Sequence, residues 1–154
     1  MNTYNKYTLI RFESQTLTDA EREIVLKAAA AASKNGGFRF LPGHCFRNAV
    51  YLAYYSGGAL KYVEGTAEGL PHAWNAINGK VVDLTVRVTH GTPGRYGNRI
   101  FGTFPRRLTY EGVEFTAEHA WAASMTPPYV MGPLLPDELE QEARDAETIP
   151  GDEP

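Results

Sequence analysis

Apolar positions recur at helical spacing in two stretches of the first third of the chain, and each stretch has clear boundaries. The first opens at Thr18, with Glu21 three residues later completing a capping box, and it stops at Asn35-Gly36-Gly37. The second begins near Cys45 and ends at Gly57-Gly58, and its apolar residues fall three or four positions apart. The pattern therefore predicts two helices here, the second of them buried.

Shorter stretches rich in β-branched and aromatic residues predict antiparallel strands. Asn78-Gly79 is the strongest short-range hairpin signal in the chain. Two strand-like segments flank Glu111-Gly112, and Pro127-Pro128 ends a last helix. The expected strands are 6–12 at a sheet edge, 60–67, 72–77, 80–88, 106–110 and 113–116; the last helix covers 117–125, and 90–107 is a loop. Together these elements predict the α+β class.

The length and charge of the chain limit its organisation. At 154 residues it suits one domain with a sizeable core, which we place at residues 1–135. Residues 136–154 hold eight acidic residues and one basic residue, which predicts an acidic, partly disordered tail. The net charge of −3 lacks the basic signature of a nucleic-acid-binding protein. We expect the arginine cluster to be solvated surface; it comprises Arg95, Arg99, Arg106 and Arg107.

Composition also bears on the compartment. No stretch approaches the roughly 20 apolar residues that cross a bilayer. The N-terminal stretch has no apolar region of the kind found in signal peptides. A single cysteine, Cys45, permits no internal disulfide and fits a reducing compartment. We therefore expect a cytoplasmic protein without membrane association.

The predicted hairpin brings together residues that carry chemistry. A two-residue turn at residues 78–79 places Trp74 opposite Asp83 and His72 opposite Thr85, with all four side chains on one face. His72 and Asp83 are then diagonal neighbours, with Cβ atoms roughly 7–8 Å apart at most. A carboxylate bonded to one ring nitrogen fixes the tautomer of a histidine and stabilises its imidazolium form. The sequence thus supplies a histidine and a group that orients it.

Cys45 is the candidate nucleophile. It follows Pro42-Gly43-His44 at the predicted start of a helix, where unpaired N–H groups favour a thiolate and can bind an oxyanion. Two other interpretations remain. A lone cysteine is often a small buried hydrophobe. Alternatively, Cys45, His72 and Asp83, with His44, are ligand types that zinc accepts, although the close ligand pairs common in structural zinc sites are absent.

Three runs carry a resemblance to a known superfamily. GHCFRNAVYLA, YVEGTA and HAWNAINGKVVDLT resemble the core of papain-like and transglutaminase-like cysteine enzymes, over residues 43–86. The resemblance implies a small papain- or transglutaminase-like α+β domain whose catalytic helix packs on an antiparallel sheet. It implies Cys45 as nucleophile, His72 as general base and Asp83 as the residue that orients it. The stretch before the cysteine, FRFLPGH, lacks the glutamine that such peptidases carry as an oxyanion donor.

The expected activity is that of a cysteine-dependent hydrolase or acyltransferase acting on an amide or thioester bond in a protein or peptide, without a cofactor. Hydrolysis, deamidation and transamidation use the same residues and remain open. The alternative is a catalytically silent binding or inhibitor protein that retains the fold, as small phage-encoded proteins commonly do. Three further residues are candidates for substrate binding or support. Asn48 binds substrate or ties a loop, Trp74 packs in the core or walls the histidine, and His44 caps the helix or touches substrate.

Overall fold

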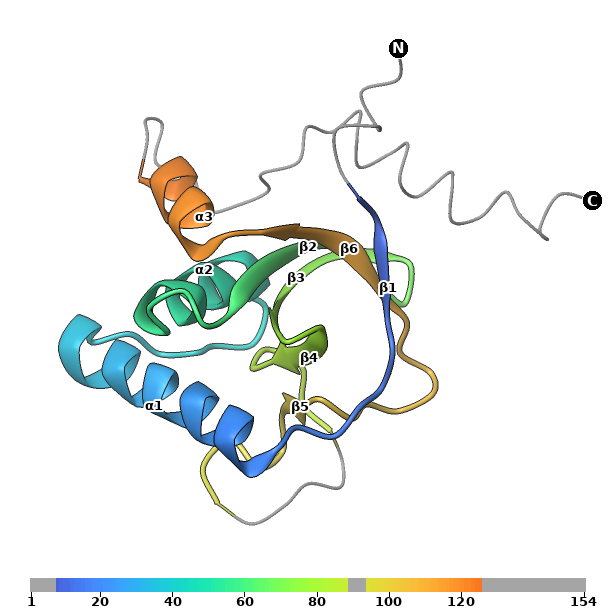
Figure 1. Cartoon of the computed structure of the whole chain (residues 1–154), viewed down its shortest axis with the longest axis horizontal. Helices are drawn as coiled ribbons and strands as arrows, with labels where there is room; N and C mark the ends of the chain where they lie inside the picture. The colour runs from blue at the N-terminus through green and yellow to red at the C-terminus, as the bar shows by residue number, and fades with distance from the viewer. Residues whose placement is uncertain (1–7, 89–93, 126–154) are drawn as a thin grey trace, which may run out of the picture.

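The computed structural model of the protein describes residues 8–88 and 94–125. The strands are β1 (Ile10–Phe12), β2 (Lys61–Ala67), β3 (Leu70–Ile77), β4 (Lys80–Asp83), β5 (Ile100–Phe101) and β6 (Tyr110–Phe115); the helices are α1 (Asp19–Gly36), α2 (Cys45–Tyr55) and α3 (Ala117–Ser124). Within the described residues these strands form one antiparallel sheet in the order β1-β6-β2-β3-β4-β5. Figure 1 shows the sheet curling, with α1 and α2 on one side and β1 on the other. The predicted α+β class is confirmed.

Both predicted ends of α1 are confirmed. The Thr18 hydroxyl accepts a hydrogen bond from the Glu21 N–H at 3.1 Å, and the Glu21 carboxylate accepts one from the Thr18 N–H at 2.8 Å. This reciprocal capping box satisfies two amide groups that the first turn leaves unpaired. The helix ends where Gly37 adopts a left-handed conformation with a φ of 62°.

A buried amide anchors α2 to the sheet. The Asn75 side chain, on β3, donates hydrogen bonds to the carbonyl oxygens of Ala49 at 2.8 Å and Lys61 at 3.1 Å. Apolar side chains of α2, β2, β3, β6 and α3 pack around this contact. Because a polar bond and an apolar face both fix the helix, its N-terminal residue Cys45 has a defined place against the sheet.

The β3–β4 hairpin has the predicted register. Ile77 pairs with Lys80 across a two-residue turn in which Asn78 and Gly79 both have positive φ, as a type I′ turn requires. Glu21 holds this turn, because its carboxylate accepts hydrogen bonds from Asn78 Nδ2 at 2.7 Å and Lys80 Nζ at 2.8 Å. The Lys80 and Asn78 bonds lower the pKa of Glu21 to about 2. The start of α1 and the hairpin are therefore tied together.

β4 is shorter than the strand predicted over residues 80–88. It ends at Asp83, whose Oδ1 accepts hydrogen bonds from the backbone N–H groups of Thr85 at 2.9 Å and Val86 at 3.2 Å. An aspartate that bonds the backbone two or three residues on turns the chain away from the sheet. The prediction that Thr85 lies opposite His72 is therefore wrong.

The last part of the sheet also differs from the prediction. Residues 110–115 form one strand, β6, which runs through Glu111-Gly112 instead of breaking there. Gly112 pairs with Gly65 of β2, and a Cβ on it would lie 2.7 Å from the carbonyl oxygen of Glu64. The glycine thus marks a close approach of two backbones, not a turn. The expected loop 90–107 contains β5, while the edge position of β1 and the helix α3 are as predicted.

The predicted acidic tail at residues 136–154 and the helix-ending Pro127-Pro128 lie outside the described residues. In the part of the chain that is described, no helix is long and apolar enough to cross a membrane.

Candidate active site

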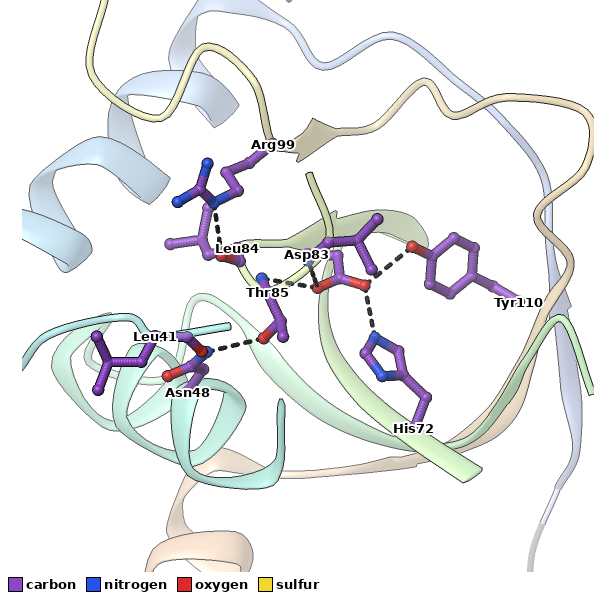
Figure 2. Close-up of polar contacts among 9 residues, drawn as sticks. Leu41, Asn48, His72, Asp83, Leu84, Thr85, Arg99 and Tyr110 are labelled. Carbon is purple, nitrogen blue, oxygen red and sulfur yellow. Dashed lines mark hydrogen bonds and ion pairs between the residues drawn. The ribbon is translucent and has the colours of Figure 1, made fainter. Parts of the chain in front are cut away.

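His72 and Asp83 are in direct contact, as the hairpin register predicts. The contact joins His72 Nε2 to Asp83 Oδ2 (Figure 2). The two atoms are 2.7 Å apart, and the two side chains are 13% and 1% exposed. The pair is therefore largely shielded from solvent, and the carboxylate is the more deeply buried of the two groups. Hydrogen bonds of this kind between charged groups are stronger when water is excluded.

Asp83 has four hydrogen-bond donors. Its Oδ2 accepts from His72 and from the Tyr110 hydroxyl at 2.9 Å, while its Oδ1 accepts from the Thr85 and Val86 N–H groups. A buried carboxylate needs such compensation to stay ionised. Burial and the charge of Asp83 raise the pKa of Tyr110, which keeps the phenol a neutral donor. Figure 2 shows Tyr110 and His72 converging on one oxygen of Asp83.

Sequence reasoning missed Tyr110. It lies on β6, 27 residues beyond Asp83, and β6 pairs with β2 and β1 instead of with β4. No local spacing therefore connects the two residues, and only the curl of the sheet brings them together.

Cys45 interacts with the imidazole of His72. It is the first residue of α2, its side chain is partly buried, and its interaction with the imidazole is one of the causes that raise the pKa of His72. Because Nε2 is engaged by Asp83, Nδ1 is the nitrogen left to face the thiol. The structure thus brings all three predicted residues together: Cys45, His72 and Asp83.

The surroundings of the histidine favour its charged form. Burial on its own would lower the pKa of His72, but the hydrogen bonds and charges of Asp83 and Cys45 outweigh it and raise the pKa to about 10. An imidazolium next to a sulfur atom favours the thiolate form of that sulfur. The structure therefore sets a ring that favours a positive charge beside the Cys45 sulfur.

The start of α2 has no side-chain cap. His44 occupies the cap position but makes no capping hydrogen bond through its side chain, and it is exposed. Of the two roles considered for His44, helix capping is therefore absent. The first N–H groups of α2, beginning with that of Cys45, point out of the helix end beside the thiol, where an oxyanion would be stabilised.

Asn48 ties together the two chain segments that flank the site. Its Nδ2 donates to the Leu41 carbonyl oxygen at 2.9 Å and to the Thr85 hydroxyl at 2.8 Å, and the residue is 3% exposed. The loop before Cys45 is thereby joined to the turn after Asp83. Asn48 thus has the structural role, since its amide donors are already used.

Trp74 lies in the core behind the histidine. It is 1% exposed, and its ring lies 5.9 Å from His72 and 4.9 Å from Tyr110, measured between ring centroids. Phe12 of β1 packs edge-on against it at 5.8 Å. Trp74 therefore walls the inner side of the histidine and is too buried to contact a substrate.

Across residues 8–88 and 94–125, no group of three or more His, Cys, Asp or Glu side chains is arranged to hold a metal ion. Comparison of the chain with models of known protein families, with curated proteins and with solved structures found no match.

Proposed function

We propose that the protein is a cysteine-dependent hydrolase or acyltransferase of papain- or transglutaminase-like architecture, acting on an amide or thioester bond in a protein or peptide. One observation carries the proposal: the His72 ring lies 2.7 Å from the buried Asp83 carboxylate and also interacts with Cys45, the first residue of α2. Nucleophile, base and orienting group in this order are the general requirement for an activated thiol.

In the proposed reaction, the proton of the Cys45 thiol already resides on His72 as an imidazolium, and the Cys45 thiolate attacks the carbonyl carbon of the substrate. The N–H of Cys45 at the start of α2 stabilises the oxyanion of the tetrahedral intermediate. His72 returns the proton to the leaving amine or thiol, which departs and leaves a thioester on Cys45. Water or a second amine then attacks the thioester, losing a proton to His72, and the free thiol is restored.

Asp83 and Tyr110 support this chemistry without contacting the substrate. The Asp83 carboxylate orients the ring, so that the nitrogen facing the thiol exchanges the proton. Tyr110 and two backbone N–H groups hold the carboxylate in place. These bonds restrict Asp83 to one rotamer, which keeps the base aligned with Cys45.

A silent binding or inhibitor protein is the second candidate, and one observation favours it. No side-chain amide among the described residues is available as a second oxyanion donor near Cys45. The stretch FRFLPGH contains none, and the Asn48 amide is committed to Leu41 and Thr85. In an acyl-transfer enzyme, the second donor then has to be a further backbone N–H of the first turn of α2.

Alkylation of Cys45 by iodoacetamide tests the site. We expect the native thiol to react rapidly at about pH 6, well below the ordinary cysteine pKa of about 8.5, and His72→Ala to abolish that reactivity. His119→Ala is the matched control, because His119 belongs to the other His-Ala-Trp triplet and is exposed on α3. Equal reactivity of native protein and His72→Ala contradicts the proposed pair.

Turnover separates the two candidate functions. With p-nitrophenyl acetate, an acyl-transfer enzyme releases a burst of nitrophenolate and carries an acetyl thioester on Cys45, detectable in the intact protein by mass spectrometry. Cys45→Ser removes the burst in that case. A thiol that is alkylated rapidly but forms no acyl-enzyme with this ester or with thioesters supports the binding protein and contradicts the enzyme.

A further inference from the structure

A cavity lies between the start of α1 and the segment around β5, and Cys45 is not among its lining residues. The cavity has a volume of about 520 Å³, and its charged lining residues, among those described, are Arg22 and Arg99. Thr16 and Thr103 add hydroxyl groups, and Phe101 and Phe104 supply aromatic walls. The lining is therefore rich in hydrogen-bond donors, positively charged and partly apolar, and no described carboxylate lines it.

Arg99 is a lining residue of this cavity whose side chain is held in place by a hydrogen bond. Its Nε donates to the Leu84 carbonyl oxygen at 2.9 Å, which fixes the side chain, and it is partly buried. Within residues 8–88 and 94–125 no carboxylate lies within ion-pair distance of it. Burial and the nearby charge of Arg87 lower the pKa of Arg99. Arg99 also donates a hydrogen bond to the neutral Asn98 Oδ1, and a partly buried guanidinium without a carboxylate beside it is stabilised by an anion.

The charge of Asp83 reaches Arg99 but does not neutralise it. Both oxygens of Asp83 are occupied by four other donors. Figure 2 shows Arg99 on the opposite side of Asp83 from His72. The cavity is therefore distinct from the place where a substrate carbonyl meets Cys45.

Arg22 brings a second positive charge to the cavity from α1. Its guanidinium carbon lies 4.6 Å from the centroid of the Phe101 ring, which orients the group over the aromatic wall. Two guanidinium groups from distant parts of the chain line one cavity. The planar fork of arginine suits carboxylate and phosphate oxygens.

We propose that the Arg22–Arg99 cavity binds an oxyanion, a carboxylate or phosphate group carried by a ligand with an apolar or aromatic portion that packs on Phe101 and Phe104. The Arg99 guanidinium binds the oxygens, Arg22 adds positive charge to the wall, and the threonine hydroxyls donate at the rim. This proposal does not depend on the cysteine chemistry and stands or fails separately from it.

Titration of the full chain, followed by amide NMR shifts at Gly97 and Thr103, tests the site. The probes are inorganic phosphate and phenylacetate, each compared with sodium chloride at the same ionic strength. We expect saturable shifts with at least one probe. Saturation by phosphate alone identifies a phosphate ligand, and saturation by phenylacetate alone identifies an aromatic carboxylate.

Substitutions assign the binding to the cavity. Arg99→Gln is expected to weaken binding at least about tenfold, as loss of a charge-assisted bond implies. Arg22→Gln removes the second charge without touching the Leu84 bond, which keeps the test valid if Arg99→Gln does not fold. Arg95→Gln is the control, because Arg95 is exposed, does not line the cavity and changes the net charge equally. No saturable shift beyond chloride, or equal weakening in Arg95→Gln, overturns the proposal.

Discussion

Replacing Asp83 by asparagine is the sharpest test of how the site works. The amide oxygen of Asn can take the place of Oδ1 and still accept from the Thr85 and Val86 N–H groups. Its NH₂ group then faces His72 Nε2 and the Tyr110 hydroxyl. The hydroxyl can turn and accept, but Nε2 has to give up its proton to accept. The proton then sits on the nitrogen facing Cys45, which is the wrong tautomer for a base.

The size of the effect follows from the bond that is lost. A hydrogen bond between charged groups contributes about 1.5–3 kcal/mol, and each 1.4 kcal/mol is a factor of ten. Losing the Asp83 carboxylate therefore shifts the thiolate–imidazolium equilibrium by about 10- to 150-fold. The effect is not diluted by solvent, because the Asp83 side chain is 1% exposed.

The assay is the rate constant of iodoacetamide alkylation, measured from about pH 5 to about pH 10. At about pH 6 we expect Asp83→Asn to react at least about tenfold more slowly than native protein. Above about pH 9 the two rates converge, because an ordinary thiol is then largely ionised. Circular dichroism establishes that the variant is folded. A folded variant with the native pH profile refutes the reasoning, since Asp83 would then be only a structural acceptor.

Three further substitutions test the framework of the site. Tyr110→Phe removes one donor from Asp83 while keeping the ring, so denaturant titration should give a free energy of unfolding lower by about 1–3 kcal/mol. Gly65→Ala places a Cβ 2.0 Å from the Glu111 carbonyl oxygen, so overpacking should cost about 1–3 kcal/mol or more. Glu21→Gln should lower the free energy of unfolding by an amount that depends on pH. The pKa of Glu21 falls from 4.5 to about 2 on folding. The stability that Glu21 contributes is therefore fully present above pH 4.5 and is lost as the pH falls to about 2.

Matched controls accompany these measurements. Tyr54→Phe changes an exposed tyrosine and should leave the free energy of unfolding unchanged. Glu23→Gln removes a neighbouring exposed carboxylate on α1 and is the control for the loss of one acidic group from this helix. If Tyr110→Phe or Gly65→Ala has the free energy of unfolding of the native protein, the role given to that residue is wrong. If the difference in free energy of unfolding between native protein and Glu21→Gln is the same at every pH, the low pKa of Glu21 is wrong.

Local chemistry made much of the site predictable. A two-residue turn has a fixed pairing, so the Asn78-Gly79 signal alone is enough to place His72 and Asp83 on one face. The capping box of Thr18 and Glu21 and the glycines after α1 predict that helix for the same reason. In each case a short-range rule determines the geometry, and tertiary packing agrees with it.

The missed features depend on contacts between distant segments. Tyr110 reaches Asp83 only because the sheet curls. Gly112 suggested a turn, but its role is a close approach to Gly65 that no local pattern reveals. β5 pairs with β4 at the sheet edge. With only two residues, β5 is too short to show a periodic pattern of its own. β4 ended early because the Asp83 side chain bonds the following backbone.

The two-residue turn at Asn78-Gly79 also determines what distant relatives can look like. Inserting one residue there would turn the β4 side chains to the other face and point Asp83 into the apolar cluster with Leu84. Most surface loops tolerate insertions, but this one cannot lengthen by a single residue without separating the pair. We therefore expect homologues to keep the spacing of eleven positions between His72 and Asp83. A search for homologues of this protein should use that spacing, together with a cysteine at the start of an upstream helix, before it uses overall sequence identity.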